Sequence, residues 1–439
     1  MEGLPRNFIW GVSTSAYQTE GAVAEDGRTP SVWDTFSRRP GAIADGSTGD
    51  VATDHYHRWD EDVALLADLG VGAYRFSTSW SRIMPDDSGR PNAAGLDFYA
   101  SLVDGLSRWA IKPVVNLYHW DLPQWLQDRG GWRERETADR FAEYAAVVAD
   151  ALGNQVDVWC TLNEPFEHCM LGHVLGEHAP GLTLPLDEAF AVAHHLLLAQ
   201  GKAVRALREA GAETVMAINS YAPARPASDS EADRTVAALY DVLQNRLFTD
   251  PPLTGRYPEE LEPLVAPFVR DGDLDVIATP VDLWGVNYYA VNAVRAVDGP
   301  IPLEVVAPEG HPLTAFGWAV APEGLTETLV GLRDRYGDAL PVVVVSENGC
   351  AYDDVVGADG SCDDPERVAY LGAHLDAIAA AIAEGVDVRG YFVWSLTDNW
   401  EWAEGFTKRF GLVHVDYATQ KRVPKTSFAW YRDRIGRWG

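Results

Sequence analysis

Short β-rich apolar segments alternate with amphipathic helical segments along the whole chain, and this alternation limits the possible folds more than any other feature. Helical periodicity is clear at residues 60–70 and at residues 136–153, where the second segment ends in a glycine cap. Strand followed by helix, repeated eight times, is typical of a single α/β barrel of the (β/α)8 TIM type, which we predict as one domain over residues 1–439. The eight predicted strands are residues 8–13, 73–80, 112–120, 156–164, 214–221, 282–289, 341–349 and 388–396.

An open, doubly wound sheet uses the same strand and helix units and is the alternative fold. No G-x-G-x-x-G motif follows the first predicted strand to support it. Two long connections, residues 14–58 and 290–321, interrupt the alternation. Because the loops at the C-terminal face of a barrel form its active site, we expect these two connections to build the rim of a pocket.

The charge of the chain excludes several classes of partner. Asp and Glu number 65 against 35 Lys and Arg, so the net charge is −30. Such a surface repels phosphate backbones and anionic lipids, and we predict neither nucleic acid nor a membrane as a partner. The segment MEGLPRNFIWGVS has no basic stretch followed by an apolar run, so we expect a cytoplasmic protein. The four cysteines lack C-x-x-C spacing and are predicted to be free thiols, and monomer and homo-oligomer both remain open.

Polar and aromatic side chains gather at the C-terminal ends of the predicted strands, which is where barrel active sites lie. Any one of them alone is better explained as a structural side chain, but their shared position favours a site. Two are carboxylates at the tips of apolar strands, where a charge is costly unless it is used or paired. The group comprises Arg75, Trp80, Asn116, His119, Trp120, Asn163, Glu164, Asn287, Tyr289, Glu347, Asn348 and Trp394.

The two carboxylates, Glu164 and Glu347, follow strands on different sides of one barrel mouth, so their side chains can converge across it. Two carboxyl groups that meet over a sugar ring carry out glycoside hydrolysis: one protonates the leaving oxygen and the other stabilises or attacks the anomeric carbon. They stand about 5–5.5 Å apart in retaining enzymes and about 6.5–9.5 Å apart in inverting ones, and the sequence leaves this distance open. The 16 tryptophans also suit a sugar site, with Trp318, Trp394 and Trp402 the best candidates for contact with a ligand.

Two groups of histidines resemble metal ligands. His119 stands with Trp120 and Asp121 after a predicted strand and could combine with the two glutamates, and His55 and His57 form a pair in DHYHR. Their spacing matches no H-E-x-x-H or related ligand pattern. We therefore predict no metal, and we expect His55 and His57 to make structural hydrogen bonds before the first long helix.

The sequence resembles glycoside hydrolase family 1, the β-glucosidase family, from FIWGVSTSAYQTEGA near its start to RFGLVHVDY near its end. TLNEP (161–165) and SENG (346–349) resemble the acid/base and nucleophile motifs of this family. Supporting segments are YRFSTSWSRI (74–83), NLYHWDLP (116–123) and WSLTDNWEW (394–402).

This resemblance implies a catalytic domain with the activity of a retaining β-glucosidase that needs no cofactor. Its substrates would be small-molecule β-glycosides, with terminal β-D-glucosyl residues removed from oligosaccharides or from aryl and alkyl glucosides, and its biological role would lie in cellulose degradation. Hydrolysis would proceed by double displacement, with Glu347 as the nucleophile and Glu164 as the acid/base.

The resemblance also implies which residues bind the substrate. Trp394 would be the stacking floor under the sugar and Trp318 the platform for the aglycone, while Arg75 and Tyr289 would support the nucleophile. Phe166 stands where many family members have Trp, which leaves the aglycone preference open. The implied substrate-binding set is Gln18, His119, Trp120, Asn163, Asn287, Tyr289, Trp318, Trp394, Glu401, Trp402 and Phe410.

Several alternatives remain open on the same site. β-Galactosidase, β-fucosidase or transglycosylase specificity would use the same residues. A 6-phospho-β-glycosidase is disfavoured because a phosphate pocket requires Ser and Lys where this chain has Glu401. A non-catalytic sugar-binding barrel would be expected to lack one of the two glutamates, and both are present.

Overall fold

Eight parallel strands close into a barrel in the order β1-β11-β10-β7-β5-β4-β3-β2. The structure is a computed structural model that describes residues 3–299 and 301–437. Each barrel strand lies within one of the predicted ranges, so the (β/α)8 barrel is confirmed and the doubly wound alternative is wrong. The strands are β1 Ile9–Ser13, β2 Ala73–Ser77, β3 Lys112–Tyr118, β4 Val158–Asn163, β5 Val215–Tyr221, β7 Leu283–Tyr288, β10 Val342–Asn348 and β11 Val388–Trp394.

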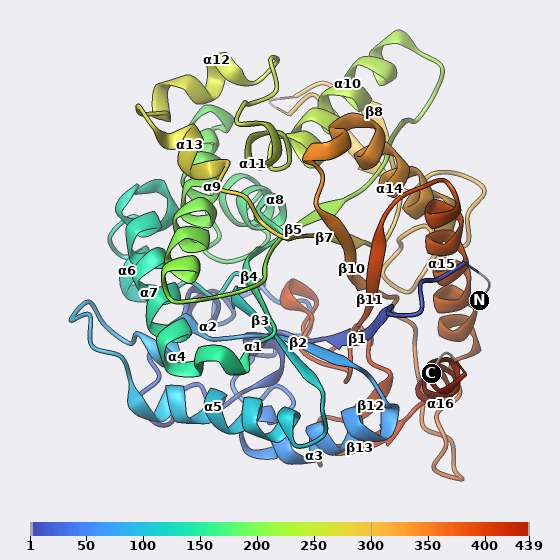
Figure 1. Cartoon of the computed structure of the whole chain (residues 1–439). Coiled ribbons are helices and arrows are strands. Elements are labelled where there is room, and N and C mark those ends of the chain that lie inside the picture. Colours follow the sequence, from blue (N-terminus) through green and yellow to red (C-terminus); the bar gives the residue numbers. More distant parts are fainter. Residues whose placement is uncertain (1–2, 300, 438–439) are drawn as a thin grey trace.

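Helices surround the strands on all sides of the barrel (Figure 1). The predicted helix at residues 60–70 begins earlier, at His55, and the one at residues 136–153 ends at Leu152. Gly153 follows it at a φ of 56°, a backbone conformation that glycine adopts without steric cost. The longer helices are α3 His55–Leu69, α5 Ala93–Ser107, α7 Glu136–Leu152, α9 Leu186–Glu209, α10 Glu231–Asp241, α14 Pro322–Tyr336, α15 Pro365–Ala383 and α16 Thr426–Gly436.

Short helical segments occupy the connections between these elements. The α-helical ones are α1 Ala16–Thr19, α2 Val32–Phe36, α4 Trp80–Ile83, α6 Gln124–Gln127, α8 Pro165–Cys169, α11 Asp250–Thr254, α12 Glu262–Val265 and α13 Asp273–Ile277. Two π-helical turns, η3 Met170–Val174 and η4 Val242–Arg246, follow α8 and α10. The 3-10 turns are η1 Gly131–Arg133, η2 Gly153–Gln155, η5 Ala266–Phe268, η6 Gly337–Ala339 and η7 Trp402–Glu404.

An apolar layer fills the inside of the barrel, as is usual for this architecture. Its side chains come from β2, β3, β4, β5, β10 and β11, so strands from around the whole barrel contribute to one layer. The layer supports from below the polar side chains at the C-terminal strand ends. It consists of Ala73, Val114, Cys160, Met216, Ile218, Val344 and Phe392.

Two small sheets lie outside the barrel and were not predicted. The long connection at residues 290–321 folds back on itself as the antiparallel strands β8 Asn292–Ala296 and β9 Leu303–Val306. They form a three-stranded sheet with β6 Ala224–Pro226. Near the end of the chain, β12 Val413–Asp416 pairs with β13 Lys421–Pro424.

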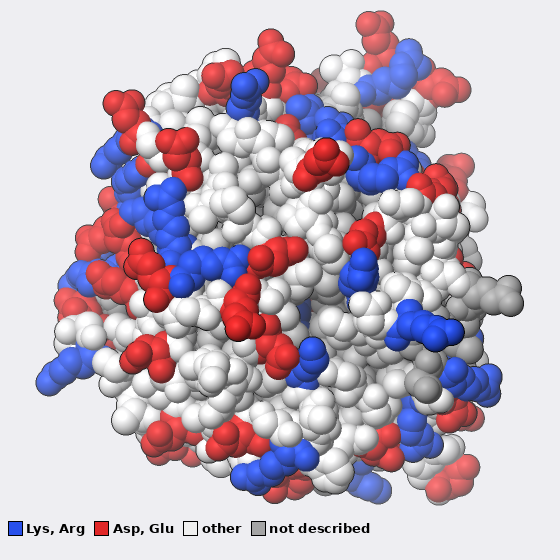
Figure 2. All heavy atoms as spheres, in the orientation of Figure 1, with Lys and Arg blue, Asp and Glu red and all other residues white. Residues whose placement is uncertain are grey.

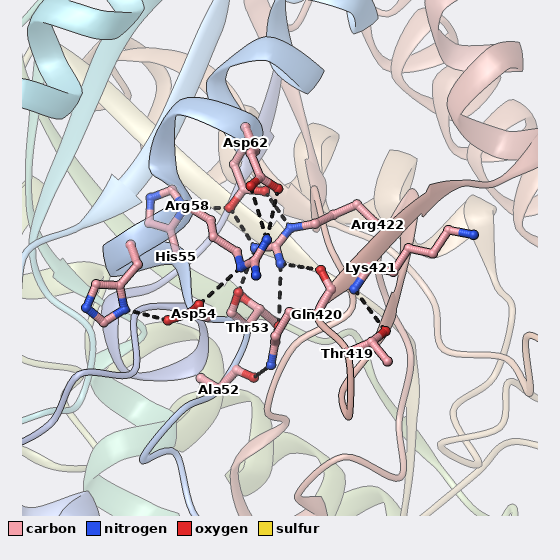
Figure 3. A network of polar contacts seen from close by, with 12 residues as sticks. Ala52, Thr53, Asp54, His55, Arg58, Asp62, Thr419, Gln420, Lys421 and Arg422 are labelled. Atoms are coloured by element: carbon pink, nitrogen blue, oxygen red, sulfur yellow. Dashed lines mark hydrogen bonds and ion pairs between the residues drawn. The ribbon is translucent and has the colours of Figure 1, made fainter.

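Arg422 on β13 joins the C-terminal hairpin to the long connection at residues 14–58 (Figure 3). Its Nε donates to Asp62 Oδ1 at 3.0 Å and its Nη2 to the Thr53 carbonyl at 2.6 Å. His55 Nδ1 lies 2.7 Å from Asp62 Oδ2, as expected of a structural histidine. Burial alone would raise the pKa of the Asp62 carboxyl, but His55 and Arg422 lower it overall. The network therefore anchors the segment that carries Gln18.

The surface carries charges of both signs. On the face seen in Figure 2, Asp and Glu side chains are interspersed with Lys and Arg rather than gathered in one patch. Among the described residues, no helix has the length and apolar character needed to cross a membrane. Cys160, Cys169, Cys350 and Cys362 are buried free thiols, as predicted.

Candidate active site

A cavity of about 810 Å³ opens at the C-terminal ends of the barrel strands. Most residues of the predicted site face this cavity, although they come from distant parts of the chain. Three predicted residues, Gln18, Arg75 and Asn163, lie behind the lining and contact it. The predicted residues that line the cavity are His119, Trp120, Glu164, Asn287, Tyr289, Trp318, Glu347, Trp394, Glu401, Trp402 and Phe410.

Glu347 stands near the end of β10, where the strand leaves its regular pairing with β7. The register shifts between Val345 and Glu347, which places Glu347 opposite Asn287. Such irregularities re-aim side chains at active sites. Arg75 Nη1 donates to Glu347 Oε1, and the Tyr289 hydroxyl donates to Oε2 at 2.8 Å. The carboxylate is thus held by a cation on one oxygen and a hydroxyl on the other.

The glycine of the SENG motif is required by close packing against the next strand. A Cβ on Gly349 would lie 1.9 Å from the carbonyl oxygen of Trp394. Any side chain there would push β10 away from Trp394, which lines the same cavity. The motif therefore keeps Glu347 and Trp394 close to each other.

Glu164 lies between β4 and α8 in the left-handed region, with a φ of 46°. This conformation costs a non-glycine residue roughly 1–2 kcal/mol, and it turns the side chain towards the cavity. Asn287 Nδ2 donates to Glu164 Oε1 at 2.8 Å. Burial, followed by the negative charge of Glu347, raises the pKa of Glu164 well above its usual value.

The two carboxyl groups are connected by a chain of hydrogen bonds behind the cavity. Arg75 Nη2 donates to Asn163 Oδ1 at 2.6 Å, and Asn287 Nδ2 donates to the same oxygen at 3.1 Å. Asn287 also contacts Glu164, while Arg75 also contacts Glu347. One carboxyl group is therefore paired with a cation and the other with a neutral amide, so their environments favour opposite protonation states.

Polar side chains and aromatic rings together close the inner end of the cavity. Gln18 Nε2 donates to Glu401 Oε2 at 3.2 Å, and Asn163 Nδ2 lies 3.1 Å from His119 Nε2. Burial first, and the Glu347 charge second, raise the pKa of Glu401 to about 8. Burial and the charge of Arg75 lower the pKa of His119 well below its usual value, so the ring is neutral. These groups offer both donors and acceptors to a bound hydroxyl.

Tryptophans shape this inner end. The Trp394 ring stacks on His119 with 5.7 Å between ring centroids, and the Trp402 ring lies 4.7 Å from Trp120. Trp120 and Trp402 both adopt positive φ, at 72° and 45°. Non-glycine residues held in this way are frequent at functional sites, where surrounding contacts compensate for the strain.

The outer end of the cavity is more apolar. Trp318 is half-buried and stacks on Phe316 with 4.1 Å between centroids, and Phe410 lies 6.0 Å from the Trp318 ring. The connection at residues 290–321 supplies part of this wall, as predicted, whereas none of the lining residues comes from residues 14–58. The individual residues of the wall, apart from Trp318 and Phe410, were not predicted, because most of them lie on segments between the barrel strands. The unpredicted lining includes Phe166, Glu167, Met170, Leu171, Leu175, Ser220, Tyr240, Gln244, Asn292, Ile301, Leu303, Val305 and Phe316.

Three further residues of the predicted strand-end group, Trp80, Asn116 and Asn348, do not line the cavity. Asn116 Nδ2 lies 3.4 Å from His119 Nδ1, and Asn348 Nδ2 donates to the Tyr288 carbonyl at 2.6 Å. Trp80 begins α4 and packs in the core against Tyr144, with stacked rings 5.0 Å apart. The strand β2 ends at Ser77, so the chain has already turned away from the mouth before Trp80.

For the outer wall, one signal was available in the sequence. Glu167 is a second acidic side chain, three residues after Glu164 in NEPFE.

Of the histidines that resembled metal ligands, His55 and His57 contact carboxylates. His119 instead contacts the amides of Asn116 and Asn163. His57 Nδ1 lies 2.6 Å from Asp54 Oδ1, and its Nε2 lies 3.1 Å from Glu25 Oε2. Over residues 3–299 and 301–437, no group of three or more His, Cys, Asp or Glu side chains is arranged to hold a metal ion.

Comparison with known proteins places this geometry in a family. Residues 1–439 match the model of Glycosyl hydrolase family 1. The chain is 49% identical to a bifunctional β-D-glucosidase/β-D-fucosidase from Bifidobacterium breve, covering 98% of this chain and 97% of the relative. It is 45% identical to β-glucosidase A from Thermotoga maritima, with the same coverage of 98% and 97%.

Solved structures agree with these relatives. The psychrophilic β-glucosidase from Micrococcus antarcticus superimposes with a TM-score of 0.95 at 45% identity, covering 99% of this chain and 98% of that one. The Thermotoga maritima β-glucosidase in complex with deoxynojirimycin gives a TM-score of 0.95 at 42% identity, and each chain is covered completely (100%).

Proposed function

The chain belongs to glycosyl hydrolase family 1 and is a β-glucosidase, and we propose that it acts by double displacement with Glu347 as nucleophile and Glu164 as acid/base. One observation carries these assignments: Glu347 is paired with a cation, whereas Glu164 is paired with a neutral amide. Glu347 accepts hydrogen bonds from Arg75 and Tyr289, which stabilise a carboxylate. Glu164 contacts the neutral amide of Asn287, and its pKa is raised.

In the first step, a Glu347 oxygen attacks the anomeric carbon while the bond from that carbon to the leaving oxygen breaks. Glu164 transfers its proton to the leaving oxygen. Glu347 then carries the sugar as a neutral ester, so its charge no longer favours the protonated form of Glu164. Glu164 accepts a proton from water, which attacks the anomeric carbon and releases the sugar with its configuration retained.

For substrate, we propose a terminal β-D-glucosyl residue bound at the inner end of the cavity. Trp394 supports its apolar face, and Gln18, His119, Asn163, Glu401 and Trp402 bind its hydroxyls directly or through their neighbours. Trp120, Asn287 and Phe410 complete this set, and Trp318 is the platform for the leaving group. Gln18 and Asn163 act from behind the lining, through their hydrogen bonds to Glu401 and His119.

Several broader features belong to the same proposal. Residues 1–439 form one catalytic domain, located in the cytoplasm, whose natural substrates are short β-glucosides such as those released in cellulose degradation. The four free, buried cysteines are consistent with a reducing compartment. Cell fractionation with an antibody to the protein tests the location.

The experiment for the activity is a panel of 4-nitrophenyl β-glycosides assayed with the purified protein. We expect kcat/KM to be highest for the β-glucoside, with the β-fucoside as second substrate, because the Bifidobacterium breve relative carries both activities in its name. Proton NMR should detect β-glucose as the first product. An α-anomer formed first would mean inversion and would overturn the double displacement.

A further inference from the structure

Three glutamates line the cavity without a part in this mechanism: Glu167, Glu177 and Glu404. Glu177 is exposed, and Glu404 Oε2 lies 3.7 Å from Lys408 Nζ, which leaves Glu167. Glu167 follows Glu164 by three residues on α8, so it lies on the same wall as the acid/base and faces the leaving-group side. Ser220 Oγ donates to Glu167 Oε1 at 3.1 Å, and Gln244 Nε2 donates to the same oxygen at 3.4 Å. Among the described residues, these are the only side chains that donate to Glu167, and both use the same oxygen.

A chain of hydrogen bonds fixes the orientation of this carboxylate. Asn292 Nδ2 donates to the Tyr240 hydroxyl at 3.1 Å, and that hydroxyl donates to Gln244 Oε1 at 2.9 Å. Gln244 Nε2 in turn donates to Ser220 Oγ at 3.1 Å. Every donor in the chain points towards Glu167 Oε1, and all five side chains line the cavity. Oε2 is therefore left to accept from whatever occupies the cavity.

The side chains around Glu167 and its hydrogen-bonded neighbours determine which leaving group this part of the cavity prefers. The neighbouring outer wall is apolar, with Met170, Leu171 and Leu303 among its lining residues. A partly buried carboxylate oxygen that loses water without gaining a donor destabilises the bound complex. An aryl or alkyl leaving group has no hydroxyl to offer, whereas a sugar offers several and can still stack its apolar face on Trp318.

We propose that Glu167 is a specificity-determining residue of the leaving-group site, where its free oxygen binds a hydroxyl of a sugar leaving group. The inference rests on the proposed β-glucosidase function and refines it: the preferred leaving group is a second sugar. Sites built to bind a hydroxyl discriminate strongly against analogues that lack it.

The test compares two substrates in two variants, Glu167→Leu and Glu167→Gln. For Glu167→Leu, kcat/KM for cellobiose should fall about 10- to 100-fold, while kcat/KM for 4-nitrophenyl β-glucoside stays within about threefold. Glu167→Gln keeps an acceptor for Ser220 and Gln244 and should lower the cellobiose value by a smaller factor, about threefold to tenfold. If the leucine variant does not fold, the glutamine variant decides by the same ratio.

The matched controls are Glu143→Leu and Glu143→Gln, which replace an exposed glutamate on the outer helix α7. Neither control should change kcat/KM for either substrate. Equal losses on both substrates in the Glu167 variants would assign Glu167 to structure and overturn the proposal. A shift of the basic limb of the pH profile without a change in the substrate ratio would overturn it as well, because Glu167 would then act only through the pKa of Glu164. Retaining hydrolysis of the aryl glucoside by the wild type is a separate result, and its absence would refute the β-glucosidase mechanism instead.

Discussion

The inner and outer ends of the cavity are built in different ways. The inner end is made of side chains at or just after the tips of barrel strands, and each polar group there is held by another polar group, as in the pairs Gln18–Glu401 and Asn163–His119. The outer end is made by inserted segments, including α8, η4 and the β8–β9 hairpin, and is largely apolar. A rigid polar end suits a constant reaction on one sugar, and an inserted outer wall allows the leaving group to vary without disturbing that chemistry.

Removal of the nucleophile at the inner end is the strongest test of this contrast. Glu347→Ala should lower kcat by about 10⁴-fold or more with every leaving group, because no other group can form the ester. Added azide should restore turnover by attacking from the vacated side, giving an α-glycosyl azide. The product is identified by NMR, and a β-glycosyl azide would contradict the assignment of Glu347.

Removing the acid/base should instead make the rate depend on the leaving group. For Glu164→Ala, kcat/KM should fall about 10²- to 10⁴-fold with cellobiose, whose leaving oxygen needs a proton. The loss should be much smaller with 2,4-dinitrophenyl β-glucoside, because that phenolate leaves without protonation. The slope of log kcat/KM against leaving-group pKa measures this difference. A uniform loss across the series would indicate a structural role for Glu164.

Glu401 tests whether the inner end recognises a neutral sugar. Above pH 8, wild-type kcat/KM for 4-nitrophenyl β-glucoside should exceed that for its 6-phosphate by about 100-fold, because the phosphate then meets the ionised Glu401 without a basic partner. The pKa of Glu401 is about 8, so this preference should grow as the pH rises through that value and Glu401 ionises. Glu401→Ser should reduce the preference. A wild type that prefers the phosphorylated sugar would refute the specificity.

The pH profile is a milder test of the same two environments. Glu164 must be protonated to act as an acid, and its pKa is raised, so kcat/KM should stay high at neutral pH and fall about tenfold per pH unit above the Glu164 pKa. In enzyme trapped as the glycosyl ester on Glu347, the Glu164 pKa should be lower, as measured by NMR of labelled glutamate. An unchanged Glu164 pKa would mean that the Glu347 charge has no part in raising it.

The smallest effect is expected at the outer platform. Trp318→Ala should raise KM for 4-nitrophenyl β-glucoside about twofold to tenfold and leave the anomeric outcome unchanged, because stacking contributes little beyond the area that it buries. Trp109→Ala is the matched control, since Trp109 is 60% exposed and does not line the cavity. A loss in Trp318→Ala as large as that of Glu164→Ala with cellobiose would remove the distinction between the two ends.

Local patterns in the sequence are sufficient to predict the barrel and much of the inner end. Apolar runs of strand length separated by helical periodicity are local signals, and each of the eight strands lies within its predicted range. Since parallel strands in a barrel all end on one face, the polar residues after them meet there whatever the loops do. The strand-end positions of Glu164, Glu347 and Trp394 are therefore enough to assign these three residues to one site.

Tertiary contacts instead determine how the two carboxyl groups are oriented. They also determine the wall of the cavity that faces the leaving group. The register shift before Glu347 and the left-handed backbone of Glu164 arise from contacts between neighbouring strands and loops, which no local pattern encodes. Glu167 and Ser220 are 53 residues apart, and Gln244 reaches them from a π-helical turn. Contacts of this kind are set by the packing of inserted segments against the barrel, because their side chains gain stabilising partners only once the barrel has closed.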